Sequence, residues 1–172
     1  FAPDQYLDPD NPADQVLRMQ DLNLRCFYNP QNLYVVDRYV NGLRALRPGN
    51  EQIVLFAAIA GVPRDLVDAT ALAGVDFADE ASRDGYYEGI LADARMQQVP
   101  DPSRPEGQGN LSPSCDTAIG LAFPPRRIVE VAQRFGEQGI VQSICQRDLG
   151  PAIDAILERI GDRLTNPGGV GR

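Results

Sequence analysis

The 172-residue sequence predicts an α/β fold in which a parallel sheet lies under helices. Two short apolar runs, residues 53–60 and 140–145, have the length and the β-branched content of buried strands. A helical segment stands before and after each run. This repeated helix–strand–helix order indicates parallel strands joined by right-handed crossovers. Because two strands make a thin sheet for a chain of this length, we expect the sheet to be incomplete.

Helical spacing marks residues 33–47 as the first of these helices. The apolar positions recur every three or four residues and form one buried stripe: Leu33, Val36, Val40, Leu43 and Leu46. Asn32 can cap the N-terminus, and Pro48 with Gly49 ends the helix. The run 53–60 follows, and its continuous apolar character predicts a strand that is buried on both faces.

Three further helices begin at prolines, which fit the first turn of a helix. Pro63 opens a short one. Pro124 and Pro125 open the second, whose apolar face consists of Ile128, Val131, Ala132 and Phe135. Pro151 opens the last, whose buried face should consist of Ile153, Ile156, Leu157, Ile160 and Leu164. A helix over residues 79–91 is also predicted, although two glycines weaken it.

We interpret the chain as a single α/β domain, residues 1–172, with three less regular parts. An irregular arm with one helical turn covers residues 1–30. A surface loop rich in proline, glycine and serine covers residues 97–114. A loose tail covers residues 165–172.

Acidic residues dominate the charge, which is −8 at neutral pH with an isoelectric point near 4.5. This balance argues against binding to nucleic acid and against docking on an anionic membrane. No apolar run reaches the roughly 18 residues that span a bilayer. The arm fits a calcium loop poorly, because Ala13 and Met19 replace the required glycine and glutamate. We interpret its aspartates as a solvated acidic loop: Asp4, Asp8, Asp10 and Asp14.

The sequence contains no histidine, which removes the commonest general base and a favoured zinc ligand. Hydrolase arrangements that pair serine or cysteine with histidine are therefore excluded within this chain. We assign no catalytic residue. Paired carboxylates can carry out acid–base catalysis without histidine, so a carboxylate-based hydrolase remains as an alternative that would use Asp76, Asp79, Glu80 or Asp116.

Two of the three cysteines, Cys115 and Cys145, lie on either side of one helix–strand unit. Residues that precede the helix of such a unit lie near the carboxyl end of its strand, so the two sulfur atoms can meet. We expect a disulfide there, and with it an oxidising compartment. Two separate buried thiols are the alternative. Cys26 is left over, which suggests that it is free or has a partner outside this chain.

Several blocks of the sequence together resemble the C-terminal half of von Willebrand factor A-like domains. They are LYVVDRYVNGLRAL, IVLFAAIAGVP, PSC and GLAFPPRRIVEVAQRFGEQGIVQSICQRDLGPAIDAILERI. The similarity covers about residues 22–164 and points to domains of exported proteins and lipoproteins from myxobacteria and related bacteria. It implies a Rossmann-like parallel sheet between helices. It also implies a role in adhesion or protein–protein interaction, often through a metal at the carboxyl edge of the sheet.

The sequence departs from this family at the metal site, which starts from the motif D-x-S-x-S. The stretch DPSRP, residues 101–105, fails at the last serine, so we assign no metal ligand and no cofactor. The early strands of the family would precede residue 1. We therefore expect that the chain is a piece of a longer protein, and that the missing half holds a partner for Cys26.

Three residues are candidates for ligand binding. Asp116, beside Cys115, is either a residue at the metal edge or a loop or helix-capping residue. Arg126 and Arg127 fall in the first turn of a helix, where positive charge is unfavourable. A ligand carboxylate would compensate for them. Alternatively, one arginine forms a salt bridge within the fold and the other is solvated.

Taken together, these observations predict a non-enzymatic interaction or adhesion module of an exported bacterial protein, located in the cell envelope or outside the cell. The partner would be another protein of unknown identity. Besides the hydrolase, a third hypothesis is a structural fragment. In that case the sheet edge is completed by the missing half, by another chain or by a second copy.

Overall fold

The computed structural model describes residues 6–118 and 120–165. Contacts divide the chain into two units, which we describe separately. The first combines the chain up to Tyr34 with Gln98–Ser112, and the second combines Val35–Gln97 with the chain from Pro113 onward. The predicted tail beyond Thr165 lies outside the described residues.

The first unit is more helical than the irregular arm that the sequence predicts. It contains helices α1 (Pro12–Arg18) and α2 (Leu22–Tyr28) and the 3-10 turn η2 (Pro30–Asn32). Asn11 caps α1 by accepting a hydrogen bond from the backbone N–H of Ala13 at 3.0 Å. Asn11 followed by Pro12 is a local signal for a helix start, although the high content of proline and aspartate in this arm indicates irregular structure.

The predicted surface loop is tied to this arm through Asp21. The backbone N–H of Asp21 donates to the carbonyl of Gly107 at 2.7 Å, and its carboxylate accepts from the N–H of Gly109 at 2.6 Å. Both glycines have positive φ, at 80° and 85°, a backbone conformation that other residues rarely adopt. The glycines of this loop are therefore needed for the turns that bring its backbone to Asp21.

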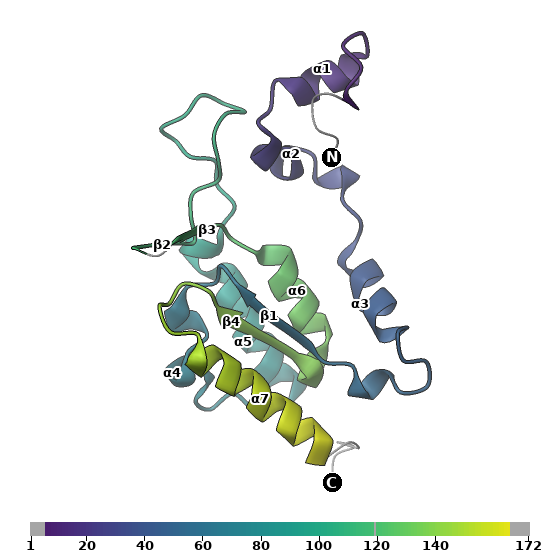
Figure 1. The fold of residues 1–172 in the computed structure, drawn as a ribbon, viewed down its shortest axis with the longest axis vertical. Helices are drawn as coiled ribbons and strands as arrows, with labels where there is room; N and C mark the ends of the chain where they lie inside the picture. The colour runs from purple at the N-terminus through teal and green to yellow at the C-terminus, as the bar shows by residue number, and fades with distance from the viewer. Residues whose placement is uncertain (1–5, 119, 166–172) are drawn as a thin grey trace. The chain divides into compact units, whose positions relative to one another are not determined.

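The second unit is built on two parallel strands, β1 (Phe56–Ala60) and β4 (Gly139–Ser143) (Figure 1). Their register runs from Phe56 opposite Gly139 to Ala60 opposite Ser143. This pairing confirms the predicted α/β class and the predicted parallel neighbours. A short antiparallel hairpin of β2 (Cys115–Thr117) and β3 (Gly120–Ala122) was not predicted. Three residues a strand give too little periodicity to recognise.

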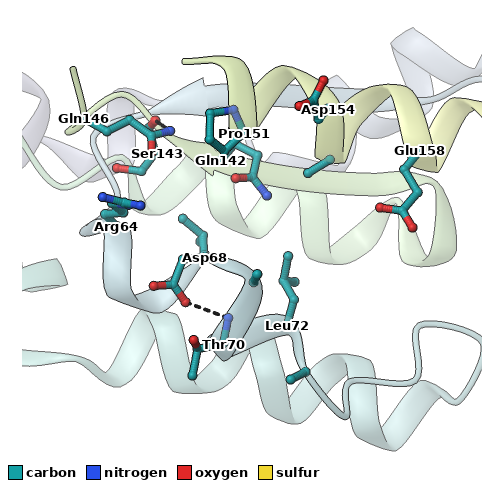
Figure 2. A pocket seen from close by; sticks show the side chains of 14 residues that line it. Arg64, Asp68, Thr70, Leu72, Gln142, Ser143, Gln146, Pro151, Asp154 and Glu158 are labelled. Atoms are coloured by element: carbon teal, nitrogen blue, oxygen red, sulfur yellow. Dashed lines mark hydrogen bonds between the residues drawn. The ribbon is translucent and has the colours of Figure 1, made fainter. Parts of the chain in front are cut away.

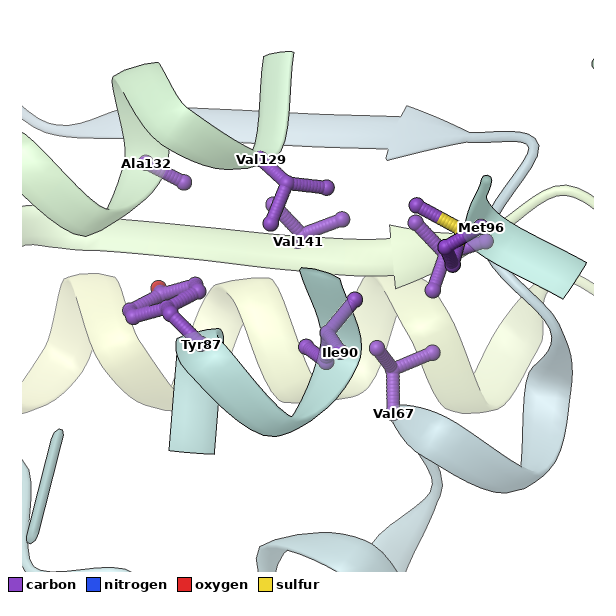
Figure 3. Close-up of a cluster of buried hydrophobic side chains, with 8 residues drawn as sticks. Val67, Tyr87, Ile90, Met96, Val129, Ala132 and Val141 are labelled. Atoms are coloured by element: carbon purple, nitrogen blue, oxygen red, sulfur yellow. The ribbon is translucent and has the colours of Figure 1, made fainter. Parts of the chain in front are cut away.

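The core of this unit lies between the sheet and the helices α3 (Val36–Arg44), α5 (Glu80–Ala92) and α6 (Arg126–Arg134). Figure 3 shows one cluster, in which Tyr87 and Ile90 of α5 meet Val129 of α6 and Val141 of β4. A second cluster joins α3 to α6 and includes Val36, Val40, Val131 and Phe135. The predicted helix over residues 79–91 is thus confirmed with its boundaries shifted by one residue, and it begins after the cap Asp79.

The remaining segments are short apart from the last helix. They are the 3-10 turns η3 (Glu51–Ile53), η4 (Arg64–Leu66), η5 (Ala94–Met96) and η6 (Gly136–Gln138), helix α4 (Ala69–Leu72) and helix α7 (Gly150–Thr165). The single short helix expected after Pro63 is therefore divided into η4 and α4. Asp68 begins α4 and accepts hydrogen bonds from the N–H groups of Thr70 and Ala71, both at 3.0 Å.

Two burial predictions are wrong, and they share one cause. On α7, Ile153 and Leu157 are 47% and 57% exposed, although the sequence predicts that both are buried. On the first strand run, Ala57 is exposed instead of covered on both faces. A sheet of two strands offers too little surface to cover the apolar faces that the sequence provides. Ile53 is exposed for another reason: the predicted strand begins too early, and this residue lies in η3 before β1. The stripe of α3 also ends early, because Leu46 lies beyond the helix and is exposed.

Candidate functional site at the carboxyl ends of β1 and β4

The carboxyl ends of β1 and β4 are fixed by two buried serine hydroxyl groups. Ser143 donates to the carbonyl of Val62 at 2.5 Å and accepts from the N–H of Cys145 at 2.9 Å. Ser114 donates to the carbonyls of Gly61 and Ala122. These bonds join the turn after each strand to the neighbouring segment, so the rim of the sheet is held by side chain–backbone contacts.

Gly61 allows this close packing because it lacks a side chain. A Cβ atom at this position would lie 2.7 Å from Cβ of Ala122 and 2.8 Å from the carbonyl oxygen of Phe123. Such contacts are much shorter than van der Waals distances. The glycine that ends the first strand run is therefore required by the hairpin next to it.

The disulfide between Cys115 and Cys145 ties the hairpin to the end of β4, as the sequence predicts. The two Cα atoms are 6.2 Å apart, within the ordinary range for a disulfide. A hollow of about 290 Å³ lies beside it and is lined by both cysteines. Cys26 is a free, exposed thiol in the first unit.

The three candidate ligand residues are not brought together into one site. Asp116 is exposed within β2, opposite Leu121, so it caps no helix. Arg126 donates to the carbonyl of Leu91 at 2.6 Å and to that of Met96 at 3.2 Å. Its charge therefore satisfies the end of α5 and the turn that follows, instead of an acidic partner.

Arg127 is placed over an aromatic ring, with its guanidinium carbon 5.9 Å from the ring centre of Tyr39. This contact of cation and ring is possible because α3 and α6 pack side by side. Arg126 and Arg127 thus both have contacts within the fold. The prediction of a ligand role for them remains untested.

Two of the four carboxylates of the hydrolase hypothesis, those of Asp76 and Asp79, bond to backbone groups at the start of α5. Asp76 accepts hydrogen bonds from the N–H groups of Ala78 and Asp79, at 2.9 and 3.4 Å, and Asp79 accepts from Ser82 at 2.7 Å. Both aspartates and Glu80 are exposed. Their arrangement is that of a helix start.

In the arm, the carboxylates of Asp8 and Asp14 also accept hydrogen bonds from backbone groups. Asp8 accepts from the N–H of Asp10 at 2.9 Å, and Asp14 accepts from the N–H of Asp8 at 3.0 Å. Asp4 lies outside the described residues. Among residues 6–118 and 120–165, no group of three or more His, Cys, Asp or Glu side chains is arranged to hold a metal ion.

A cavity of about 570 Å³ lies beside the end of β4, between α4 and the first half of α7. Figure 2 shows the side chain of Gln142 pointing from β4 into this space. The other lining residues come from the turn before α4, from α4, from the end of β4 and from α7: Arg64, Val67, Asp68, Ala69, Thr70, Leu72, Ala73, Ser143, Gln146, Pro151, Asp154, Ala155 and Glu158.

Gln142 is the unusual residue of this cavity. It is only 5% exposed, and its Nε2 group has no hydrogen-bond partner. A buried amide without a partner destabilises the folded state, so an unoccupied donor at this position requires an explanation. The two adjacent polar residues in the apolar run IVQSIC, Gln142 and Ser143, are a signal of this site in the sequence. The predicted ligand residues were instead chosen from the segments near the cysteines and from the family resemblance.

Two groups of titratable residues near this region have shifted pKa values. Arg95 binds Asp65 with both ends of its guanidinium at 2.8 Å and also binds Asp93, and these bonds lower the pKa of both carboxyl groups. In the core, burial raises the pKa of Tyr86 and Tyr87 well above the ordinary value. Neither group lines the cavity.

Comparison with known proteins finds no matching family model, no matching curated protein and no matching solved structure. The function of the chain is therefore inferred from its own geometry. Within the described part of the chain, no helix is long and apolar enough to cross a membrane.

Proposed function

We propose that this chain is a non-enzymatic protein-interaction module of an exported bacterial protein, of the von Willebrand factor A-like type, and that a partner adds a strand to the free edge of β1. The observation that carries the proposal is the two-stranded sheet. Among the described residues β1 pairs with β4 alone, so its other edge is open. Sheets of globular proteins usually have about four to six strands, so a two-stranded parallel sheet is unusually small.

The backbone groups of β1 alternate between its neighbour and this open edge. The carbonyl of Ala60 accepts from the N–H of Ile144 at 2.8 Å, so Ala60 faces β4. By the alternation of a strand, Ala58 also faces β4, whereas the N–H and C=O groups of Ala57 and Ile59 face outward. These groups can bind the backbone of an extended segment.

The sequence of β1 lacks the features that protect a free edge. Edge strands are usually interrupted by lysine, proline, a bulge or an inward-pointing charge, and the segment FAAIA has none of these. Addition of a strand is a common mode of protein recognition in which main-chain hydrogen bonds supply affinity. The simplest donor of the strand is a second copy of the chain.

Export is supported by the covalent bond between Cys115 and Cys145. Disulfides persist mainly in oxidising compartments, which include the periplasm and the cell surface. The resemblance to exported bacterial domains points to the same compartment. In an oxidising compartment the disulfide between Cys115 and Cys145 would hold the loop after β4 in place.

Sedimentation velocity over a range of concentrations tests the strand-addition proposal. We expect association that Ala57→Pro abolishes, because this substitution removes an outward N–H without removing a bond to β4. The matched variant Ala57→Val keeps the N–H and should associate like the wild type. Amide exchange should protect Ala57 and Ile59 only in the associated form. Identical association of the proline variant and the wild type would refute the proposal.

The open edge also favours the hypothesis of a structural fragment, here in the form in which another part of the same protein completes the sheet. The two hypotheses differ in what they predict for the isolated chain. A structural fragment should associate heterogeneously through its exposed apolar surface. A monodisperse species in size-exclusion chromatography would count against the fragment.

A further inference from the structure

The cavity beside Gln142 combines an unused donor with acidic side chains. The donor is the buried Nε2 group of Gln142. The charged lining consists of Asp68, Asp154 and Glu158 against Arg64 alone, so acidic groups outnumber basic ones. We propose that this cavity binds a lysine or arginine residue of a partner polypeptide, with a backbone carbonyl of that residue accepting from Gln142. The inference rests on the proposed interaction function.

The unused amide defines what the ligand must offer at the centre of the cavity. An N–H group that is buried without a partner costs free energy in the empty protein, and a ligand acceptor removes this cost on binding. A peptide carbonyl is such an acceptor. An alkylammonium or guanidinium group cannot fill this role, because both groups only donate. The ligand therefore needs a carbonyl as well as a cation.

The acidic side chains define where the cation lies. Figure 2 shows Glu158 and Arg64 on opposite sides of Gln142. A cation is attracted to the side of Glu158 and repelled from that of Arg64. Asp68 is occupied by its cap of α4, since its Oδ1 accepts from two backbone N–H groups of that helix, so Glu158 is the better partner for the cation. Neither Asp154 nor Glu158 forms an ion pair among the described residues.

The spacing of the last two carboxylates supports the same conclusion. Asp154 and Glu158 stand four residues apart on α7, where like charges repel and weaken a helix. A bound cation relieves this repulsion. The volume of about 570 Å³ falls within the usual range of ligand cavities, which is about 300–1,000 Å³. It can therefore admit a side chain together with its flanking peptide groups.

Fluorescence polarisation with a labelled acetyl-Gly-Arg-Gly-amide peptide and its lysine and glutamate analogues tests the proposal. We expect the arginine and lysine peptides to bind and the glutamate peptide not to bind. Gln142→Leu and Glu158→Gln should each weaken binding by about tenfold, which is the effect of one lost polar contact to a buried or charged group. Glu88→Gln removes an exposed charge on α5, away from the cavity, and should leave affinity unchanged.

Thermal unfolding of the leucine variant separates recognition from folding. Leucine is apolar and close in size to glutamine, so Gln142→Leu should keep or raise the melting temperature while it weakens binding. Binding of the peptides by Ala57→Pro would show that the cavity acts whether or not strand addition occurs. Equal affinity for the arginine and glutamate peptides, or an equal loss in Glu88→Gln, would overturn the proposal.

Discussion

Reduction of the disulfide between Cys115 and Cys145 should destabilise the second unit by a predictable amount. The bond closes a loop with a sequence separation of 30 residues. The loss of chain entropy that such a loop imposes on the unfolded state amounts to about 3–4 kcal/mol. For a protein of this size, this corresponds to a fall of roughly 10 °C in melting temperature and about 2 M in the urea midpoint.

The assay is urea unfolding with and without a phosphine reductant, in a Cys26→Ser background. This background is needed because the exposed thiol of Cys26 can attack the disulfide during unfolding. The double variant Cys115→Ser/Cys145→Ser should match the reduced protein and should not respond to the reductant. Alkylation of the wild type without reductant should label one cysteine, and after reduction three. An unchanged urea midpoint on reduction would refute both the bond and the case for an oxidising compartment.

Two further predictions concern backbone packing and pH. Gly139→Ala should lower the free energy of unfolding in urea by about 2 kcal/mol or more, because its Cβ would lie 1.9 Å from the carbonyl oxygen of Ala132. The matched variant Gly89→Ala has open space around its Cβ and should stabilise α5 by roughly 0.5–1 kcal/mol. Because burial raises the pKa of Tyr86 and Tyr87 in the folded state, the unfolded chain loses these protons first, and stability should fall as pH rises above about 10. The part of the absorbance change at 295 nm that belongs to these two tyrosines, out of six in the chain, should then appear only together with unfolding; full ionisation before unfolding would contradict the assigned burial.

The parallel pairing of the two apolar runs could be predicted because it rests on patterns that are local in the sequence. Strand length, β-branched content and the flanking helices specify β1 and β4 without knowledge of their surroundings. The starts of α6, directly after Pro125, and of α7, one residue before Pro151, follow from the same kind of local signal, since proline is favoured at helix N-termini.

Burial on α7 could not be predicted in the same way. An apolar stripe shows that a helix has a face to bury, but whether that face is covered depends on how many strands lie beneath it. Here Ala152 is fully buried whereas Ile153 and Leu157 are exposed. The stripe thus reflects a larger apolar surface than the two described strands provide.

The site residues were missed for a related reason. Charged residues near the cysteines, such as Arg126, were predicted as candidates because their chemistry is visible in the sequence. Gln142 becomes a candidate only when its amide is seen to be buried without a partner, which is a property of packing. A neutral polar residue inside an apolar strand is the signal that could have identified it, since a strand interior rarely accepts one without a bond.

The open edge of β1 and the exposed apolar side chains of α7 have one property in common: no other described element covers them. Ala57 and Leu157 are exposed on segments whose sequences are those of buried elements. Natural sequences keep local preference and tertiary surroundings consistent, and departures concentrate where a protein meets something else. A partner strand at β1 would occupy the backbone groups of Ala57 and Ile59 that face away from β4. Helix α7 packs against β4, so strand addition at β1 should leave the exposure of Leu157 unchanged, and a partner that covers Leu157 would have to bind α7 itself.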